Sequence, residues 1–210
     1  MKTKIISFIK YWGKPIISYL KQKHVKVADN SGTYPKPQLN SYGSGNSVQI
    51  GHQTHTIDSR ILFYGDNCKL IIGKNCSIRN TVFWFEGENG KIVINDSTTI
   101  EGACISVASA NSITIGFDCM LSKDINICTT DSHSIIDEKR IRINPDKDIN
   151  IGDHVWIGMR VLVCKGVTIG NNSVIGAGAI VTKNIPDNSC AAGIPAKIIK
   201  SDIDWLRKRI

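Results

Sequence analysis

The sequence predicts an all-β solenoid, a parallel β-helix, and two observations lead to this fold class. Residues 151–186 divide into six hexads that each begin with an aliphatic residue: IGDHVW, IGMRVL, VCKGVT, IGNNSV, IGAGAI and VTKNIP. The fifth residue of each hexad is small or apolar too. A period of six is neither helical nor alternating, so the chain must turn a corner every six residues. Three short strands then close one coil of about 18 residues.

Residues 1–46 are expected to form a helical cap and a linker. Ile5, Phe8, Ile9 and Trp12 are spaced to share one face of a short helix, and residues 21–46 are rich in turn-forming types. Lys10 and the Gly-Lys-Pro break at 13–15 leave the apolar run too short to span a bilayer. The alternative to a cap is a peripheral membrane contact through this basic N-terminus.

Residues 47–186 are predicted to form the β-helix, of about six coils. Phrases like Val-Thr-Ile-Gly start at residues 48, 70, 92, 113, 149 and 167, so successive phrases lie 22, 22, 21, 36 and 18 residues apart. Inside the long gap the period of six holds at Leu121 and Ile127 and then fails. Residues 132–148 are therefore expected to leave the coil as an extruded loop, and such long excursions are usually functional.

Residues 187–210 are expected to turn out of the coil, run back and end in a short basic C-terminal helix. The whole chain of 210 residues has 26 basic and 18 acidic residues, which favours anionic partners such as a phosphate-bearing cofactor or an acidic glycan. Its seven cysteines include no CxxC pair. Cys76 and Cys119 fall on inward hexad positions, so reduced thiols in a cytoplasmic protein are expected.

Four segments resemble the hexapeptide-repeat acyltransferases, in particular the sugar and capsular polysaccharide O-acetyltransferases of the polysialic-acid type. They are TTDSHS at 129–134, HVWIG at 154–158, KGVTIGNNSVIGAGAIVTK at 165–183 and AAGIPAKIIK at 191–200. The resemblance implies a left-handed coil and a homotrimer with active sites between subunits. It also implies transfer of acetyl from acetyl-CoA to a hydroxyl of a bacterial surface polysaccharide, capsule or O-antigen, in the cytoplasm or at the inner face of the membrane.

By this resemblance His133 is the general base that takes the proton of the acceptor hydroxyl. A sugar hydroxyl is too weak an acid to attack unassisted, and histidine titrates near neutrality. Asp131 either orients the imidazole or meets the acceptor. Trp156 lines the channel where cofactor and acceptor meet, and the backbone near Gly158 is the candidate oxyanion donor. His154 is interpreted as structural.

The resemblance also implies a groove for the cofactor along the corners of the last coils. Lysine serves a phosphate as a point charge. The residues carried over to this groove are Met159, Ala177, Thr182, Lys183, Lys197 and Lys200.

Other functions remain open at this point. A small sugar or another small hydroxyl or amine acceptor is the alternative within the enzyme class, and a nucleophilic Cys128 would imply an acetyl-enzyme. A non-catalytic trimeric scaffold or glycan-binding module is the alternative outside it. A γ-carbonic-anhydrase-like metal site needs three histidines with a set spacing; His52 and His55 are too close, and His133 and His154 lack a third. We therefore expect no metal and no nucleic-acid partner, but a glycan acceptor, with a lipid-linked form as one option.

Overall fold

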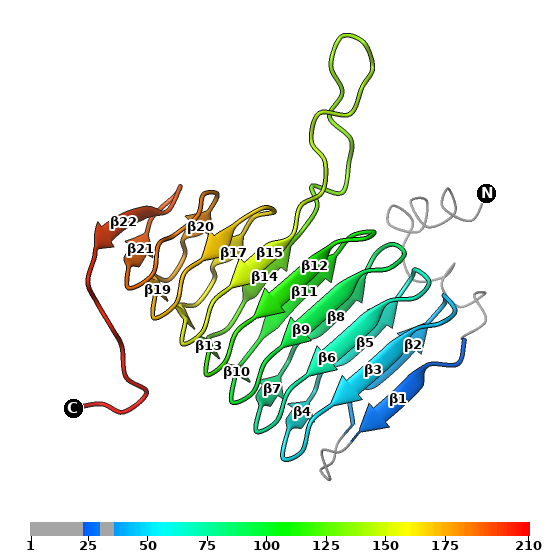
Figure 1. Cartoon of the computed structure of the whole chain (residues 1–210), viewed down its shortest axis with the longest axis horizontal. Coiled ribbons are helices and arrows are strands. Elements are labelled where there is room, and N and C mark those ends of the chain that lie inside the picture. Colours follow the sequence, from blue (N-terminus) through cyan, green and yellow to red (C-terminus); the bar gives the residue numbers. More distant parts are fainter. Residues whose placement is uncertain (1–22, 30–35) are drawn as a thin grey trace.

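The computed structural model describes residues 23–29 and 36–210, and in them the chain forms an all-β solenoid without a helix (Figure 1). Twenty-two strands lie in three sheets, and within the solenoid all neighbouring strands are parallel. Sheet A contains β1 (Lys26–Asp29), β3 (Ser47–Ile50), β6 (Lys69–Ile72), β9 (Lys91–Ile94), β12 (Ser112–Ile115), β15 (Ile149–Ile151) and β18 (Thr168–Ile169). No helix of the described residues could cross a bilayer.

Sheets B and C complete each coil, which passes from A to C to B. Sheet B contains β2 (Gln38–Ser41), β5 (Arg60–Phe63), β8 (Val82–Phe85), β11 (Ala103–Val107), β14 (Ile125–Cys128), β17 (Leu162–Val163) and β20 (Ile180–Val181). Sheet C contains β4 (His55–Ile57), β7 (Ser77–Arg79), β10 (Thr99–Ile100), β13 (Met120–Leu121), β16 (Trp156–Ile157), β19 (Val174–Ile175), β21 (Cys190–Ala192) and β22 (Lys197–Lys200). The corners between these sheets are called A/C, C/B and B/A below.

The hexad period places the aliphatic openers inside the coil, as predicted. Ile157, Val163, Ile169 and their equivalents are at most 2% exposed, and the fifth-position residues, Cys76 and Cys119 among them, are buried beside them. Each further coil extends this dry column and adds a rung of backbone hydrogen bonds. All seven cysteines are in the thiol form. The hexapeptide repeat implies that the β-helix is left-handed.

The solenoid has about seven turns rather than the six expected, because sheets A and B each contain seven strands. The additional turn comes from residues assigned to the linker: Val27 pairs with Val48, and Leu39 pairs with Ile61. Its polar, turn-rich composition concealed strands only four residues long. The expected N-terminal helix lies outside the described residues.

The predicted C-terminal helix is wrong. Residues 197–200 form β22, which pairs antiparallel with β21, and residues 201–210 continue without regular secondary structure along sheet C (Figure 1). The helical spacing of this segment is overridden by tertiary contacts, since Ile198 pairs with Ala191 and Trp205 is 6% exposed against the coil.

Candidate active site

The one long excursion of the described chain leaves the B/A corner after β14 and returns before β15, and it projects away from the coil (Figure 1). Beyond its base the two arms meet in a narrow hairpin, with an isolated antiparallel bridge between Ile136 and Arg142. The Ile143 N–H donates to the carbonyl of Ile135 at 2.8 Å. His133 is exposed and lies in the outgoing arm, close to the base. The structure thus presents its imidazole on a projecting arm.

Asn144 of the returning arm joins the two arms at the level of His133. Its side-chain Nδ2 donates to the His133 carbonyl and to Asp131 Oδ2, both at 2.8 Å, and its Oδ1 accepts from the Ile135 N–H at 2.7 Å. Asn144 is nearly buried, at 9% exposure. One side-chain amide therefore contacts His133 itself and the residues two positions before and after it.

Lys165, which follows β17 on the next coil, ties this base to the solenoid. Its Nζ donates to Asp131 Oδ2 at 2.5 Å and to the Asn144 carbonyl at 3.0 Å. The hydrogen bonds from Lys165 and then Asn144 hold the pKa of Asp131 below its ordinary value. The Asp131 carboxylate is accordingly ionised at neutral pH and engaged in holding the loop.

Trp156, in β16 of sheet C, and Met159, on the C/B corner that follows it, lie beyond the opposite edge of sheet B and are 39% and 43% exposed. Gly158 is buried between them, and a Cβ there would lie 2.7 Å from the Ala177 nitrogen. Only glycine permits this approach of two coils. The Gly158 N–H itself donates to the Ile175 carbonyl at 2.8 Å, so it is committed to the β-ladder and is not an oxyanion donor.

The residues assigned to the cofactor fall into three places. Met159 and Ala177 lie on the C/B corner, whereas Thr182 and Lys183 follow β20 on the B/A corner, the corner that carries the loop. Lys197 and Lys200 lie on the exposed edge strand β22 of sheet C. A single chain therefore does not bring His133 and Trp156 together, because sheet B lies between the loop corner and β16, which carries Trp156.

A groove of about 440 Å³ lies on the C/B corner in the coils that precede the loop. Its polar side chains include Asn80, Glu101, Lys123 and Asn126, from three successive coils. The same corner continues to the next coil through the Arg160 N–H, which donates to the Lys123 carbonyl at 2.9 Å. The groove therefore lies on the same C/B corner as Gly158 and Met159, in the coils that precede them.

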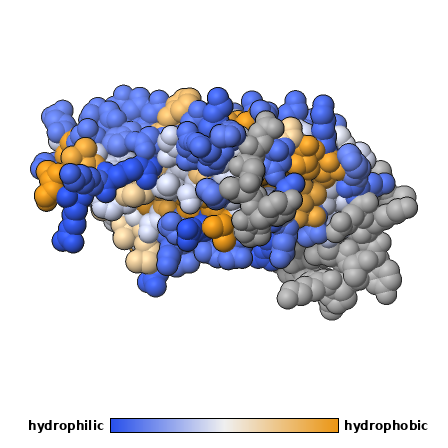
Figure 2. Space-filling view, turned by 90° about the horizontal axis from the view of Figure 1, so that it is seen from below, coloured by the Kyte–Doolittle hydropathy of each residue, from blue (hydrophilic) through white to orange (hydrophobic). Residues whose placement is uncertain are grey.

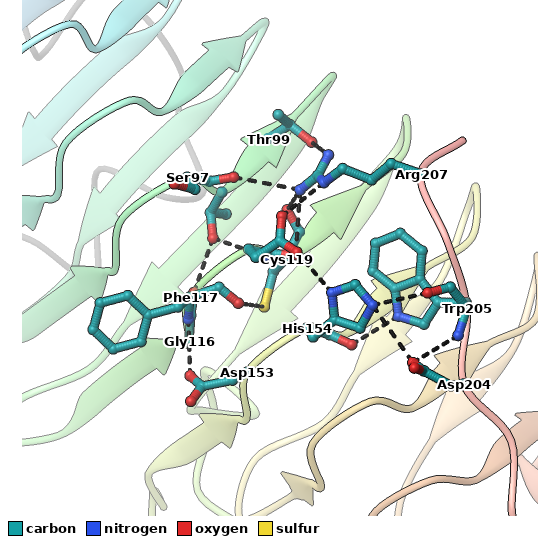
Figure 3. A network of polar contacts seen from close by, with 12 residues as sticks. Ser97, Thr99, Gly116, Phe117, Cys119, Asp153, His154, Asp204, Trp205 and Arg207 are labelled. Atoms are coloured by element: carbon teal, nitrogen blue, oxygen red, sulfur yellow. Dashed lines mark hydrogen bonds and ion pairs between the residues drawn. The ribbon is translucent and has the colours of Figure 1, made fainter.

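His154 anchors the C-terminal segment to sheet C (Figure 3). Its Nδ1 lies 2.7 Å from Asp118 Oδ2, and its Nε2 lies 2.9 Å from the Trp205 carbonyl. Arg207 donates from Nε to Asp118 Oδ1 at 2.7 Å and from Nη2 to the Cys119 carbonyl at 2.8 Å. These contacts support the structural interpretation of His154.

Apolar patches interrupt the largely hydrophilic surface of the solenoid (Figure 2). The large exposed apolar side chains include four of the projecting loop. They are Ile135, Ile136, Ile141 and Ile143. Sequence reasoning missed the loop-base roles of Asn144 and Lys165, since their partners lie 9 to 34 residues away and no periodic pattern connects them.

Residues 148–183 match the family described as bacterial transferase hexapeptide (six repeats). The chain is 38% identical over 173 residues to a polysialic acid O-acetyltransferase of Neisseria meningitidis, covering 81% of this chain and 80% of that one. It is 40% identical over 116 residues to a polysialic acid O-acetyltransferase of Escherichia coli O1:K1 / APEC, covering 55% of this chain but only 38% of that relative.

A solved structure agrees with these sequence matches. The polysialic acid O-acetyltransferase OatWY superposes with a TM-score of 0.77 at 32% identity, over 90% of this chain and 93% of that one. The chain belongs to the hexapeptide-repeat acetyltransferases, a family of acetyl-CoA-dependent O-acetyltransferases, and is similar to its polysialic acid O-acetyltransferases.

Proposed function

We propose that this protein transfers the acetyl group of acetyl-CoA to a hydroxyl of an acidic bacterial surface polysaccharide, in a capsule or O-antigen. The observation that carries the proposal is His133, exposed on a braced loop of a chain that belongs to this family. The relatives' names supply the acceptor class, and polysialic acid is the first member to test.

His133 acts as the general base in this proposal. Its imidazole takes the proton of the acceptor hydroxyl while the hydroxyl oxygen forms a bond to the thioester carbon. The tetrahedral intermediate then collapses, the carbon–sulfur bond breaks, and the proton passes from the imidazolium to the leaving thiolate. The acceptor becomes an acetyl ester and the donor becomes free CoA, with no acetyl-enzyme between them.

The oxyanion of this intermediate needs a donor at the C/B corner. Since the Gly158 N–H is used in the ladder, we assign the role to the next backbone N–H, that of Met159. The absence of a side chain at Gly158 lets two coils approach there, which holds this part of the corner rigid. Trp156 packs against the pantetheine arm or the acceptor sugar from β16, which precedes this corner.

A homotrimer completes the site. Because His133 and Trp156 lie at opposite edges of sheet B, packing sheet B of each copy around a threefold axis brings the loop corner of one subunit to the C/B corner of the next. Four outer side chains of sheet B in the last coils are apolar and half-buried, as such an interface requires: Cys128, Leu162, Cys164 and Ile180. Asn126, beside Leu162, is polar and exposed on the same face.

The cofactor and acceptor then occupy successive parts of one groove between subunits. Ala177 borders the extended pantetheine, with Thr182 alongside it, and the charges of Lys183, Lys197 and Lys200 attract the phosphates. The acceptor lies in the preceding coils, where Lys123 can meet a sugar carboxylate while Asn80 and Asn126 bind hydroxyls. We place the reaction in the cytoplasm, at the inner face of the membrane.

The test is acetyl transfer from labelled acetyl-CoA to a panel of purified polysaccharides, with polysialic acid, neutral capsules and small galactosides compared. We expect ester label on acidic polymers and at least a ~100-fold loss in His133→Ala, in line with the usual contribution of a general base. Transfer only to small galactosides, or normal turnover by His133→Ala with its fold intact, would contradict the proposal.

A further inference from the structure

We infer that Lys165 and Asn144 are positioning residues that set the place of His133 for catalysis. This inference rests on the proposed role of His133 as the base. It concerns residues that touch neither the reacting atoms nor the cofactor in the proposal, and it is carried by their contacts at the base of the loop. We call Asp131, Asn144 and Lys165 the loop clamp.

The loop needs a clamp because it leaves the parallel ladders of the coil. A general base must lie within hydrogen-bond reach of the proton it takes, and a misplacement of about 1 Å can reduce the rate by about 100-fold. His133 is exposed and lies on the arm that leaves the coil. The backbone of this arm sets where its Cβ lies.

Asn144 fixes that backbone at two adjacent points. Its amide donates to the carbonyl of His133 and accepts from the N–H of Ile135, with distances of 2.8 and 2.7 Å. These bonds reproduce the pairing that a neighbouring strand would make, but within a single side chain. Burial of Asn144 to 9% exposure reduces competition from water for both bonds.

Lys165 connects Asn144 to the rigid coil. The ammonium group joins the outgoing arm, through Asp131, and the returning arm, through the Asn144 carbonyl. The Lys165 side chain is 16% exposed and that of Asp131 is 43% exposed, so the ion pair is sheltered from solvent on the lysine side. Because Lys165 follows β17, its hydrogen bonds hold the base of the loop against the coil that follows the loop.

Loss of the loop clamp should slow the chemical step. Without Lys165 the two arms lose their shared cation, and without Asn144 the backbone at His133 loses two partners. Neither change removes a residue assigned to the cofactor. We therefore expect kcat to fall while the KM for acetyl-CoA stays the same.

The experiment compares full-length Lys165→Met and Asn144→Ala with Lys165→Arg, using Lys139→Met at the exposed loop tip as the matched control. We expect a ~10- to 100-fold lower kcat in the first two variants, a KM for acetyl-CoA within about twofold of wild type, and partial recovery in Lys165→Arg. Lys139→Met should behave as wild type.

Two further measurements separate this inference from the proposed function. Hydrogen exchange should speed up at residues 132–136 in Asn144→Ala and Lys165→Met, with the solenoid strands still protected. Wild-type kcat in both clamp variants, beside an inactive His133→Ala, overturns the clamp alone. Full activity in His133→Ala overturns the proposed function, whatever the exchange rates. A uniform loss of protection across the solenoid would show a general folding role and also overturn the clamp.

Discussion

The imidazole of His154 lies flat against the indole of Trp205, with ring centroids 4.2 Å apart and ring planes inclined by 6°. The Trp205 Nε1–H also donates to the His154 carbonyl at 2.7 Å (Figure 3). The two residues are 51 positions apart in the chain. Their contact holds a segment without regular secondary structure against sheet C.

This contact is expected to weaken as the pH rises. Burial alone would lower the pKa of His154, but the Trp205 carbonyl and the carboxylates of Asp118 and Asp204 outweigh it, so the pKa is raised above 6.5. Both ring nitrogens face oxygen acceptors, which suits the doubly protonated ring. The stabilisation is therefore complete below the unfolded pKa and is lost as the pH passes upward through the folded one.

Hydrogen exchange of residues 201–207 at pH 5.5 and 8.5, corrected for intrinsic rates, checks this. We expect up to about fivefold more opening at pH 8.5, because a partly exposed ion pair of this kind contributes up to ~1 kcal/mol. Asp118 also pairs with Arg207, whose charge persists across this range, so the segment should loosen without full release. The pH effect should vanish in His154→Gln; an unchanged effect there would assign it to another group.

Replacing Gly158 by alanine is expected to destabilise the coil and reduce acetyl transfer. The new Cβ would lie 2.7 Å from the Ala177 nitrogen and 2.9 Å from the Ile175 oxygen, both backbone atoms. Overpacking of this kind costs about 1–3 kcal/mol. Gly102→Ala on the same corner is the control, because its nearest neighbours are 3.8 Å away. Chemical denaturation compares the two, and equal midpoints would contradict the steric argument.

A charge on the outer face of sheet B should prevent trimer formation. Leu162→Asp places a carboxylate on the proposed threefold face, whereas Thr168→Asp places one on sheet A, outside that face. Burying an uncompensated charge is strongly unfavourable. Light scattering after size exclusion should give a monomer for the first and a trimer for the second. A trimeric Leu162→Asp would exclude sheet B as the interface.

Mixed assemblies should show whether one site uses two chains. His133→Ala and Trp156→Ala are each expected to have low activity, but in mixed trimers some sites receive His133 from one chain and Trp156 from another. Co-expressed variants should therefore regain a measurable fraction of activity. No gain, with mixed trimers verified by mass, would place both residues of a site on one chain.

Lysines at the proposed cofactor site and at the proposed acceptor site should affect different Michaelis constants. Lys183→Ala and Lys200→Ala are expected to raise the KM for acetyl-CoA, because each removes a charge opposite a phosphate. Lys123→Ala should instead raise the KM for an acidic polysaccharide, with the larger effect at low salt. Steady-state kinetics with each substrate varied in turn provide the measurement. A change in the same Michaelis constant for all three variants would contradict the separation of cofactor and acceptor sites.

The hexads predicted the part of the fold that repeats, because inward positions of a narrow column demand aliphatic side chains at each corner. They could not predict the first turn, where short strands such as β1 and β2 carry polar residues. The C-terminal segment was misassigned because its fate depends on His154 and Trp205 meeting in space. For the same reason the sequence located His133 at the start of a loop but could not reveal that Asn144 and Lys165 hold it.

The groove at Lys123 and the corner at Met159 belong to coils on opposite sides of the loop, although they lie on one continuous edge. A recombination event within residues 132–148 would therefore exchange the coils before the loop while leaving those after it intact. In such a chain the acceptor preference could change in one genetic step, with the donor end of the groove inherited unaltered. Solenoids of this kind can diversify by joining halves as well as by point substitution.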